Sequence, residues 1–257
     1  MSAWLPAAPC TPAACVERAR AAAAVPRAVL RLTGLVVLLL AGVAAAPLGR
    51  RLPVALVRWW GRSLVRAAGV RVRITGAAVP AGGVLLVAHH VSWLDVPLLA
   101  AVRPARTVAK AEIRRWPVAG RLAALGGTLF IERDRLRALP ETVAHLTAVL
   151  RSGASVAVFP EGSTWCGQAR GPFRRAVFQA ALDADVPVQP VRIRYLADGR
   201  TVSTAPAFVG EDTLLASVWR VVSARGLVAE ARVRPALRAG TCPDRRALAR
   251  AAEEMEK

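Results

Sequence analysis

Two adjacent histidines and an aspartate stand in the segment His89-His90-Val91-Ser92-Trp93-Leu94-Asp95, directly after the apolar run Val84–Ala88. An imidazole is the side chain best suited to accept a proton near neutral pH. A carboxylate beside it can fix its tautomer and stabilise the imidazolium that forms. His90 and Asp95 have four residues between them, which fits a general base and its orienting acid. Because this spacing also arises by chance, its meaning depends on the rest of the chain.

Three further clusters of functional residues follow or open apolar runs that are typical of strands. The first is Gly127-Thr128-Leu129-Phe130-Ile131-Glu132-Arg133-Asp134, the second Val158-Phe159-Pro160-Glu161-Gly162-Ser163-Thr164, and the third Val186-Pro187-Val188-Gln189-Pro190-Val191. Active sites of open α/β sheets commonly lie at the carboxyl ends of the strands. We therefore expect these clusters to meet His90 at one edge of a sheet.

Beyond residue 70, strand-like and helix-like apolar patterns alternate along the chain. This alternation predicts a single α/β domain with a largely parallel sheet flanked by helices. The expected strands are Val70–Thr75, Val84–Ala88, Thr107–Ala109, Thr128–Ile131, Ser155–Phe159, Val188–Tyr195, Ala207–Val209 and Val228–Val233, and the expected helices are Pro97–Val102, Ile113–Leu125, Leu136–Leu150, Phe173–Asp183, Thr213–Ser223 and Asp244–Glu256.

The first 69 residues differ from the rest in composition. Residues 1–24 are rich in Ala and Pro, and we expect them to be poorly ordered. Residues 25–69 are expected to form a membrane-associated helical segment that precedes the domain at 70–257. From Leu32 to Gly49 no residue is charged, and a helix of this length spans about 27 Å. A cleaved signal peptide, a full transmembrane span and a helix that enters one leaflet all remain open, and the last two leave the protein on a membrane.

Arginines are frequent directly after this apolar run. The positive-inside rule then places the domain on the cytoplasmic face of the cell membrane. The segment Leu52–Ala68 combines arginines with Trp59-Trp60 and is typical of an interfacial amphipathic helix.

The chain is strongly basic, with a formal net charge of +19. Such a charge favours nucleic acid, anionic lipid or phosphorylated substrates as partners. The chain has no zinc-finger spacing and no basic strand with interleaved aromatics, and its arginines are spread along its length. Because 54% of its residues are hydrophobic, we expect the chain to bind an anionic membrane surface and not nucleic acid.

The four cysteines are Cys10, Cys15, Cys166 and Cys242, and no two of them form a Cys-x-x-Cys pair. The histidines are not spaced to complete a metal site. We expect free thiols in a reducing compartment and no metal ion, with a Cys10–Cys15 bridge as the alternative.

Taken together, the four clusters resemble the motifs of the glycerophosphate/lysophosphatidate acyltransferase family, often called the PlsC type. The family carries a His-x4-Asp motif, a Gly-x-x-Phe-Ile-x-Arg block, a Phe-Pro-Glu-Gly-Thr/Ser motif and a proline-containing strand. All four occur here in that order, over roughly residues 85–195.

The resemblance implies a role for each matching residue. His90 would be the general base and Asp95 its orienting partner, and His89 would be a neighbour. No acyl-enzyme and hence no nucleophilic side chain is required. An arginine fork pairs well with phosphate. Arg133 and Lys110 would hold the phosphate of the acceptor, and Glu161, Gly162 and Ser163 would shape its site.

The implied activity is transfer of a fatty acyl chain from acyl-CoA or acyl-acyl carrier protein to 1-acylglycerol 3-phosphate, giving phosphatidic acid. The acyl thioester would be a co-substrate, with no cofactor, and the acyl carrier protein a further partner. One alternative keeps the chemistry and changes the acceptor to another lysolipid, such as a lyso-ornithine lipid. An alternative from another class is a non-catalytic basic protein that binds membranes or nucleic acid.

Overall fold

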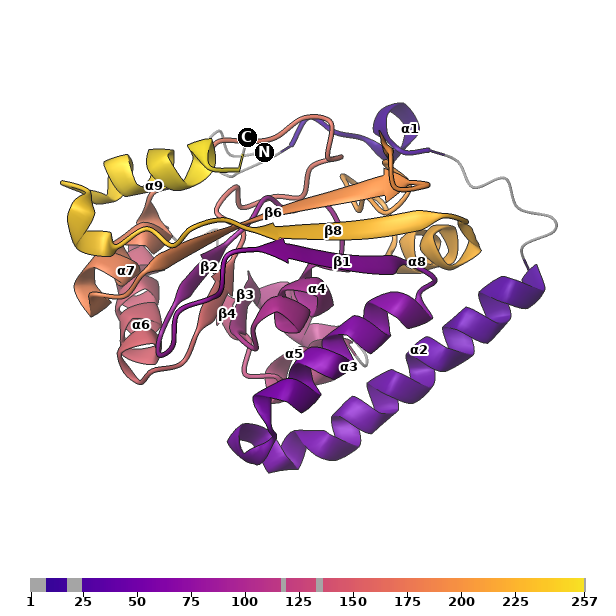
Figure 1. The fold of residues 1–257 in the computed structure, drawn as a ribbon, viewed down its shortest axis with the longest axis horizontal. Helices are drawn as coiled ribbons and strands as arrows, with labels where there is room; N and C mark the ends of the chain where they lie inside the picture. Colours follow the sequence, from indigo (N-terminus) through magenta and orange to yellow (C-terminus); the bar gives the residue numbers. More distant parts are fainter. Residues whose placement is uncertain (1–7, 18–24, 117–118, 133–135, 257) are drawn as a thin grey trace.

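A computed structural model of the chain describes residues 8–17, 25–116, 119–132 and 136–256 (Figure 1). An eight-stranded sheet runs in the order β1-β8-β6-β2-β5-β3-β4, with β7 paired to β6. The strands are β1 (Arg71–Gly76), β2 (Leu85–Val87), β3 (Arg106–Lys110), β4 (Leu129–Ile131), β5 (Val156–Val158), β6 (Val188–Ala197), β7 (Thr201–Val202) and β8 (Leu227–Val233). The helices are α1 (Pro12–Cys15), α2 (Val25–Ala45), α3 (Val54–Ala67), α4 (Asp95–Val102), α5 (Ala119–Leu125), α6 (Leu139–Arg151), α7 (Ala176–Ala184), α8 (Leu214–Ser223) and α9 (Arg245–Glu254).

The sheet is largely parallel. Strands β2, β3, β4 and β5 run parallel to one another, and β6 runs parallel to β2. Among the strands of the described residues, β7 and β8 pair with β6 in antiparallel fashion. The expected class, an α/β domain with a largely parallel sheet between helices, is therefore confirmed.

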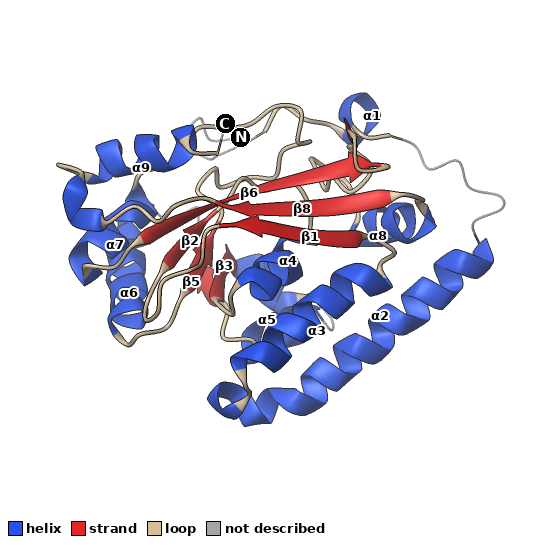
Figure 2. Ribbon diagram, in the orientation of Figure 1, coloured by secondary structure: helices blue, strands red, loops and turns tan. Residues whose placement is uncertain are grey.

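Strand β2 is buried on both faces, which explains its unbroken apolar sequence. Leu85 and Val87 pack into one core together with residues of α6, α7 and α9. Leu86 and Ala88 point to the opposite side, into a second core built with α3, α4 and α8. Figure 2 shows these two helical layers at either side of the sheet. The double layer fixes the strand that carries His90.

Two of the expected elements are wrong. The expected strand Ala207–Val209 is part of a loop, residues 203–209. The side chain of Arg220 donates hydrogen bonds to the carbonyl oxygens of Ala205 and Ala207 at 2.7 and 2.6 Å, so these groups are not available to a neighbouring strand. The expected helix Ile113–Leu125 is instead a short 3-10 helix, Ala111–Arg115, followed by α5. Trp116 between them is extended, as residues that precede proline usually are.

Helices α2 and α3 form a hairpin at the side of the domain (Figure 1). The indole Nε1 of Trp60 donates to the carbonyl oxygen of Leu38 at 2.9 Å. Gly42 lets the ring approach α2, since a Cβ there would lie 2.5 Å from Cζ2 of Trp60. Trp59 is exposed, so of the two adjacent indoles only this one is free to reach the headgroups of a membrane.

The start of α2 is also attached to the domain. Arg27 and Arg31 donate to the carbonyl groups that end α8, namely those of Val222, Ser223 and Ala224. Basic side chains favour this end of a helix. Along the rest of α2 an apolar face is exposed, with Leu30 and Leu40 at 73% and 61%. Val25–Gly49 is the one helix among the described residues that is long and apolar enough to cross a membrane.

Residues 8–17 pack on the domain, although a poorly ordered segment was expected for this part of the chain. Cys10 is buried in the core, and α1 begins at Thr11, whose hydroxyl accepts from the N–H group of Ala14. The N–H group of Glu17 donates to Thr204, and the Ser203 hydroxyl donates to the Glu17 carboxylate. Residues 8–17 are thus held against the domain by burial of Cys10 and by the hydrogen bonds of Glu17, where the sequence led us to expect poor order.

Candidate active site

His90 and Asp95 are in direct contact at the carboxyl end of β2. Nδ1 of His90 lies 2.8 Å from Oδ2 of Asp95. The loop between β2 and α4 makes this contact possible, because Asp95 is the first residue of α4 and points back toward the strand end. An ionised carboxylate only accepts, so Nδ1 carries the hydrogen and Nε2 keeps a lone pair. This arrangement would allow Nε2 of His90 to accept a proton.

Asp95 is fully buried and is held by four donors. Besides His90, the N–H groups of Val91 and Ser92 donate to Oδ2 at 2.7 and 2.8 Å. The hydroxyl group of Tyr195 donates to Oδ1 at 2.6 Å. Burial, followed by the charge of Asp95, raises the pKa of Tyr195 well above its ordinary value, so the hydroxyl stays protonated as a donor. Tyr195 is the only tyrosine of the chain, and sequence motifs gave no sign of it.

The ring of His90 is fixed from its other side by the motif after β5. Phe159 stacks on it with a centroid distance of 4.0 Å and an interplanar angle of 14°. The backbone N–H group of Trp165 donates to the carbonyl oxygen of His90 at 2.8 Å. The side chain of His90 keeps 22% of its surface exposed, whereas that of Asp95 has none. The imidazole is therefore the part of the pair that a substrate can reach.

Glu161 is buried and turned toward protein donors. Its carboxylate accepts from the N–H groups of His90 and Gly171 at 2.8 and 2.6 Å. Nδ1 of His89 lies 2.9 Å from the same carboxylate. This geometry favours a positioning role over the expected contact with the acceptor, because Glu161 ties the His90 loop to the loop after β5.

His89 and Glu256 form a second buried group beside the site. The backbone N–H group of His89 donates to Oε2 of Glu256 at 3.2 Å. Burial raises the pKa of Glu256 well above its ordinary range, and the nearby charge of Glu161 adds to this rise, while the His89 N–H group and the charge of Arg170 oppose it. His89 thus serves as a structural neighbour between two carboxylates, and His90 alone is paired with Asp95.

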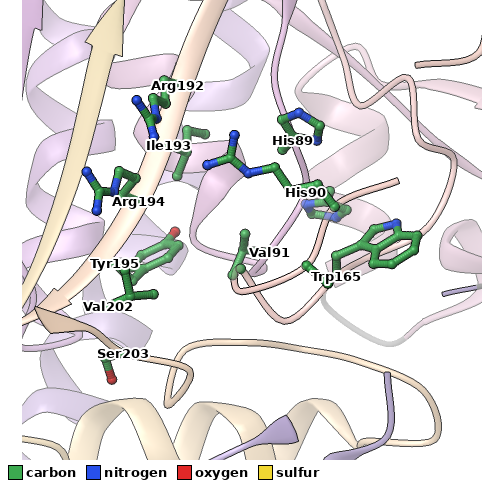
Figure 3. Close-up of a pocket in the computed structure, with 13 residues that line it drawn as sticks. His89, His90, Val91, Trp165, Arg192, Ile193, Arg194, Tyr195, Val202 and Ser203 are labelled. Atoms are coloured by element: carbon green, nitrogen blue, oxygen red, sulfur yellow. The ribbon is translucent and has the colours of Figure 1, made fainter. Parts of the chain in front are cut away.

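A pocket opens in front of His90 and is basic on one side. Arg192, Arg194 and Tyr195 come from β6 and lie across the pocket from His90 and Trp165 (Figure 3). Its remaining lining residues are His89, Val91, Gly167, Ala169, Arg170, Ile193, Val202 and Ser203.

The arginines of this pocket repel one another. Burial, followed by the like charges of Arg170, Arg194 and Arg234, lowers the pKa of Arg192. Within the described part of the chain, Nε of Arg192 has no hydrogen-bond partner. An anion in the pocket would relieve this repulsion. Arg192 and Arg194 are two residues apart and follow the proline-containing motif directly. Because residues two apart on a strand point to the same face, this spacing could have revealed a basic face.

The other expected site residues are Lys110, Gly162, Ser163 and Arg133. Lys110 ends β3 at the same sheet edge as His90, with β5 between their strands, and is exposed. Gly162 lies in a turn with φ of 74°, and Ser163 follows it with a partly exposed side chain. Arg133 lies outside the described residues. Lys110, Gly162 and Ser163 do not belong to the lining of the described pocket.

Comparison with known proteins agrees with this chemistry. The Acyltransferase family model matches residues 71–194. The lyso-ornithine lipid O-acyltransferase of Pseudomonas aeruginosa is 42% identical over 202 residues, which cover 75% of this chain and 76% of that protein. The 1-acyl-sn-glycerol-3-phosphate acyltransferase of Neisseria meningitidis is 37% identical over 171 residues, which cover 65% and 66%.

The fold has a counterpart among solved structures. The 1-acyl-sn-glycerophosphate acyltransferase PlsC from Thermotoga maritima superimposes with a TM-score of 0.67 at 17% identity, over 91% of this chain and 93% of that one. At this identity the likeness concerns the fold alone. The sequence relatives carry the assignment: the chain belongs to the glycerophosphate/lysophosphatidate acyltransferase family and is an O-acyltransferase.

Proposed function

We propose that this enzyme transfers a fatty acyl chain from acyl-CoA or acyl-acyl carrier protein to the free hydroxyl of 1-acylglycerol 3-phosphate, forming phosphatidic acid. The observation that carries the proposal is one pocket that holds both a poised base, His90, and three arginines, Arg170, Arg192 and Arg194. A lysolipid with an anionic headgroup would place its hydroxyl at the base and its charge on the arginines.

The base acts at a defined atom. Nε2 of His90 takes the proton from the acceptor hydroxyl as its oxygen attacks the thioester carbonyl carbon. Asp95 stabilises the imidazolium that forms. The C–S bond then breaks, and the leaving thiolate takes the proton back from His90. No covalent intermediate with the protein is needed, and the pair returns to its starting state.

The headgroup would be held by charge-assisted hydrogen bonds. Arg192 and Arg194 are the first choices, because both line the pocket. Lys110 and Arg133 are proposed as further phosphate contacts from the neighbouring strand ends, on the resemblance of their motifs. Gly162 and Ser163, in the turn after β5, would shape the entrance to the acceptor site.

A lyso-ornithine lipid is the second candidate acceptor. Four of the curated relatives are named lyso-ornithine lipid O-acyltransferases, one of them at 42% identity. A carboxylate can also bind to an arginine fork, so the basic pocket accommodates this headgroup as well.

A thioester-release assay with a panel of lysolipids separates the two candidates. With 1-acylglycerol 3-phosphate as acceptor, Arg192→Gln should raise KM by about 10- to 100-fold, as expected for loss of a hydrogen bond to a charged group. Arg73→Gln is the matched control, because Arg73 lies on β1 with a half-exposed side chain paired to Glu230. Turnover of lyso-ornithine lipid without turnover of 1-acylglycerol 3-phosphate would overturn the first candidate.

We further propose that the α2–α3 hairpin lies in the cytoplasmic leaflet of the cell membrane. Three features support this: the apolar exposed face of α2, its attachment to α8 through Arg27 and Arg31, and its contact with Trp60 further along. A helix attached to the domain along its length is better suited to enter one leaflet than to cross both.

Cysteine labelling in sealed vesicles tests this topology. Val25→Cys and Leu48→Cys place thiols near the two ends of the apolar helix, where both native side chains are exposed. Labelling of both by a membrane-impermeant maleimide from the cytoplasmic side supports the leaflet arrangement. Labelling of the two from opposite sides would show a full span. The unsubstituted chain reports the background from its own cysteines.

A further inference from the structure

Three of the four cysteines meet at one point behind the active-site pocket. The Sγ atoms of Cys10, Cys15 and Cys166 all lie within 4.8 Å of one another. In the N-terminal segment Cys10 precedes α1 and Cys15 is its last residue, and Cys166 lies in the loop between β5 and α7. In Figure 1 the N-terminal segment runs beside this loop along one edge of the molecule. The chain spacing of these residues gave no sign of the cluster.

The cluster is largely buried and consists of three thiols. Cys10 and Cys166 are buried, and Cys15 is partly exposed and gives the cluster a side open to solvent. All three are free cysteines. A tetrahedral zinc ion with Zn–S bonds of about 2.3 Å needs sulfur atoms about 3.8 Å apart. The separations between the three sulfur atoms are at most 4.8 Å, so none exceeds the required spacing by more than about an ångström.

A metal ion at this point would meet three sulfur ligands and displace the protons of the thiols, because metal binding releases protons from cysteine.

We propose that Cys10, Cys15 and Cys166 bind one thiophilic metal ion, with Zn²⁺ as the ion that this geometry fits, and solvent at the fourth position. This differs from the expectation of no metal, which rested on spacing along the chain. Thiolate ligands select soft cations such as Zn²⁺ over Mg²⁺ or Ca²⁺. The proposal is independent of which lysolipid the enzyme acylates.

The position of this site gives it a bracing role. The residues on either side of Cys166, Trp165 and Gly167, line the active-site pocket. Trp165 also donates its N–H group to the carbonyl oxygen of His90. A metal ion held by Cys10, Cys15 and Cys166 would therefore tie the N-terminal segment to the wall of the pocket.

Metal content of the full-length reduced enzyme tests the proposal. The protein in detergent is loaded with Zn²⁺, freed of excess ion by gel filtration and analysed by mass spectrometry of the elements. Titration with Cd²⁺, followed by its thiolate charge-transfer absorption, counts the sulfur ligands. The expected result is one ion per chain and three thiolates.

The fourth cysteine provides the matched control. Cys242 lies outside the cluster, so C242S should keep the ion. C10S, C15S and C166S should each lose it while keeping their helical circular dichroism. If C166S does not fold, C10S and C15S still decide, because they change a segment outside the sheet. Substoichiometric metal in the wild type or retention of the ion by all three variants would each overturn the proposal.

Discussion

The hydroxyl group of Tyr195 donates to Oδ1 of Asp95 at 2.6 Å, while Oδ2 of the same carboxylate faces Nδ1 of His90 at 2.8 Å. Tyr195 lies on β6, one hundred residues along the chain from Asp95. The carboxylate that contacts the proposed base is thus itself held from another strand. Tyr195 acts through Asp95, and we describe it as a positioning residue.

Replacement of Tyr195 by phenylalanine should change the pH dependence of the reaction. Without the hydroxyl donor, the Asp95 carboxylate keeps more negative charge with which to stabilise the imidazolium of His90. We expect the acidic limb of the kcat/KM profile to move to higher pH and kcat to fall by about 10-fold or more. A fall in kcat with an unmoved profile would indicate a purely structural role for the tyrosine.

The two adjacent histidines should respond differently to substitution. His90→Ala removes the base and should lower kcat by about 10²- to 10⁴-fold. In His89→Asn the amide nitrogen can replace Nδ1 opposite Glu161, so kcat should stay within about 10-fold while the melting temperature falls. Both are measured by thioester release and thermal unfolding. Turnover by His90→Ala at the wild-type rate would refute the assigned base.

Two glycines of α2 offer a matched pair for the hairpin. A Cβ at Gly34 would meet Cβ of Ala67 at 3.7 Å, an ordinary contact, so Gly34→Ala should stabilise the enzyme by up to about 1 kcal/mol through helix propensity. A Cβ at Gly42 would lie 2.5 Å from Cζ2 of Trp60, and overpacking costs about 1–3 kcal/mol. Gly42→Ala should therefore lower the melting temperature in detergent. Equal stabilisation by both changes would contradict the packing of Trp60 on α2.

Burial of Glu256 should make stability depend on pH. Its pKa is raised in the folded enzyme, so between its ordinary value near 4.3 and the raised value the folded state holds a proton that the unfolded state releases. The contribution of this group is fully present below the ordinary value and is lost as pH rises through the raised one. Glu256→Gln should flatten that decline in urea unfolding at pH 5 and pH 8. Glu254→Gln, on the exposed side of α9, should leave it unchanged.

Several site features could be read from the chain because they are local. His90 and Asp95 are joined by one short loop between a strand and a helix, so their spacing along the chain nearly dictates their contact. The alternation of apolar runs determined the α/β class, because strands buried on both faces leave a continuous apolar signature.

Contacts between distant segments could not be read in this way. The turn of Glu161 toward His89, His90 and Gly171 follows from the packing of the β5 loop against the β2 loop. Ala207–Val209 has the composition of a strand, but hydrogen bonds from the Arg220 side chain hold this region as a loop. Ile113–Leu125 has the composition of one helix, but the extended backbone at Trp116 interrupts it.

The sequence by itself determined the contact between His90 and Asp95, the class of the domain and the apolar helix near its start, since each depends on residues close together in the chain. Only the tertiary structure decided which side chains surround that pair. Tyr195 beneath Asp95, the arginines of β6 across the pocket, and Cys166 beside Cys10 and Cys15 are brought together by the order of strands in the sheet and by two cores that pack on either side of it. Burial and hydrogen bonding act through space, and spacing along the chain does not record them.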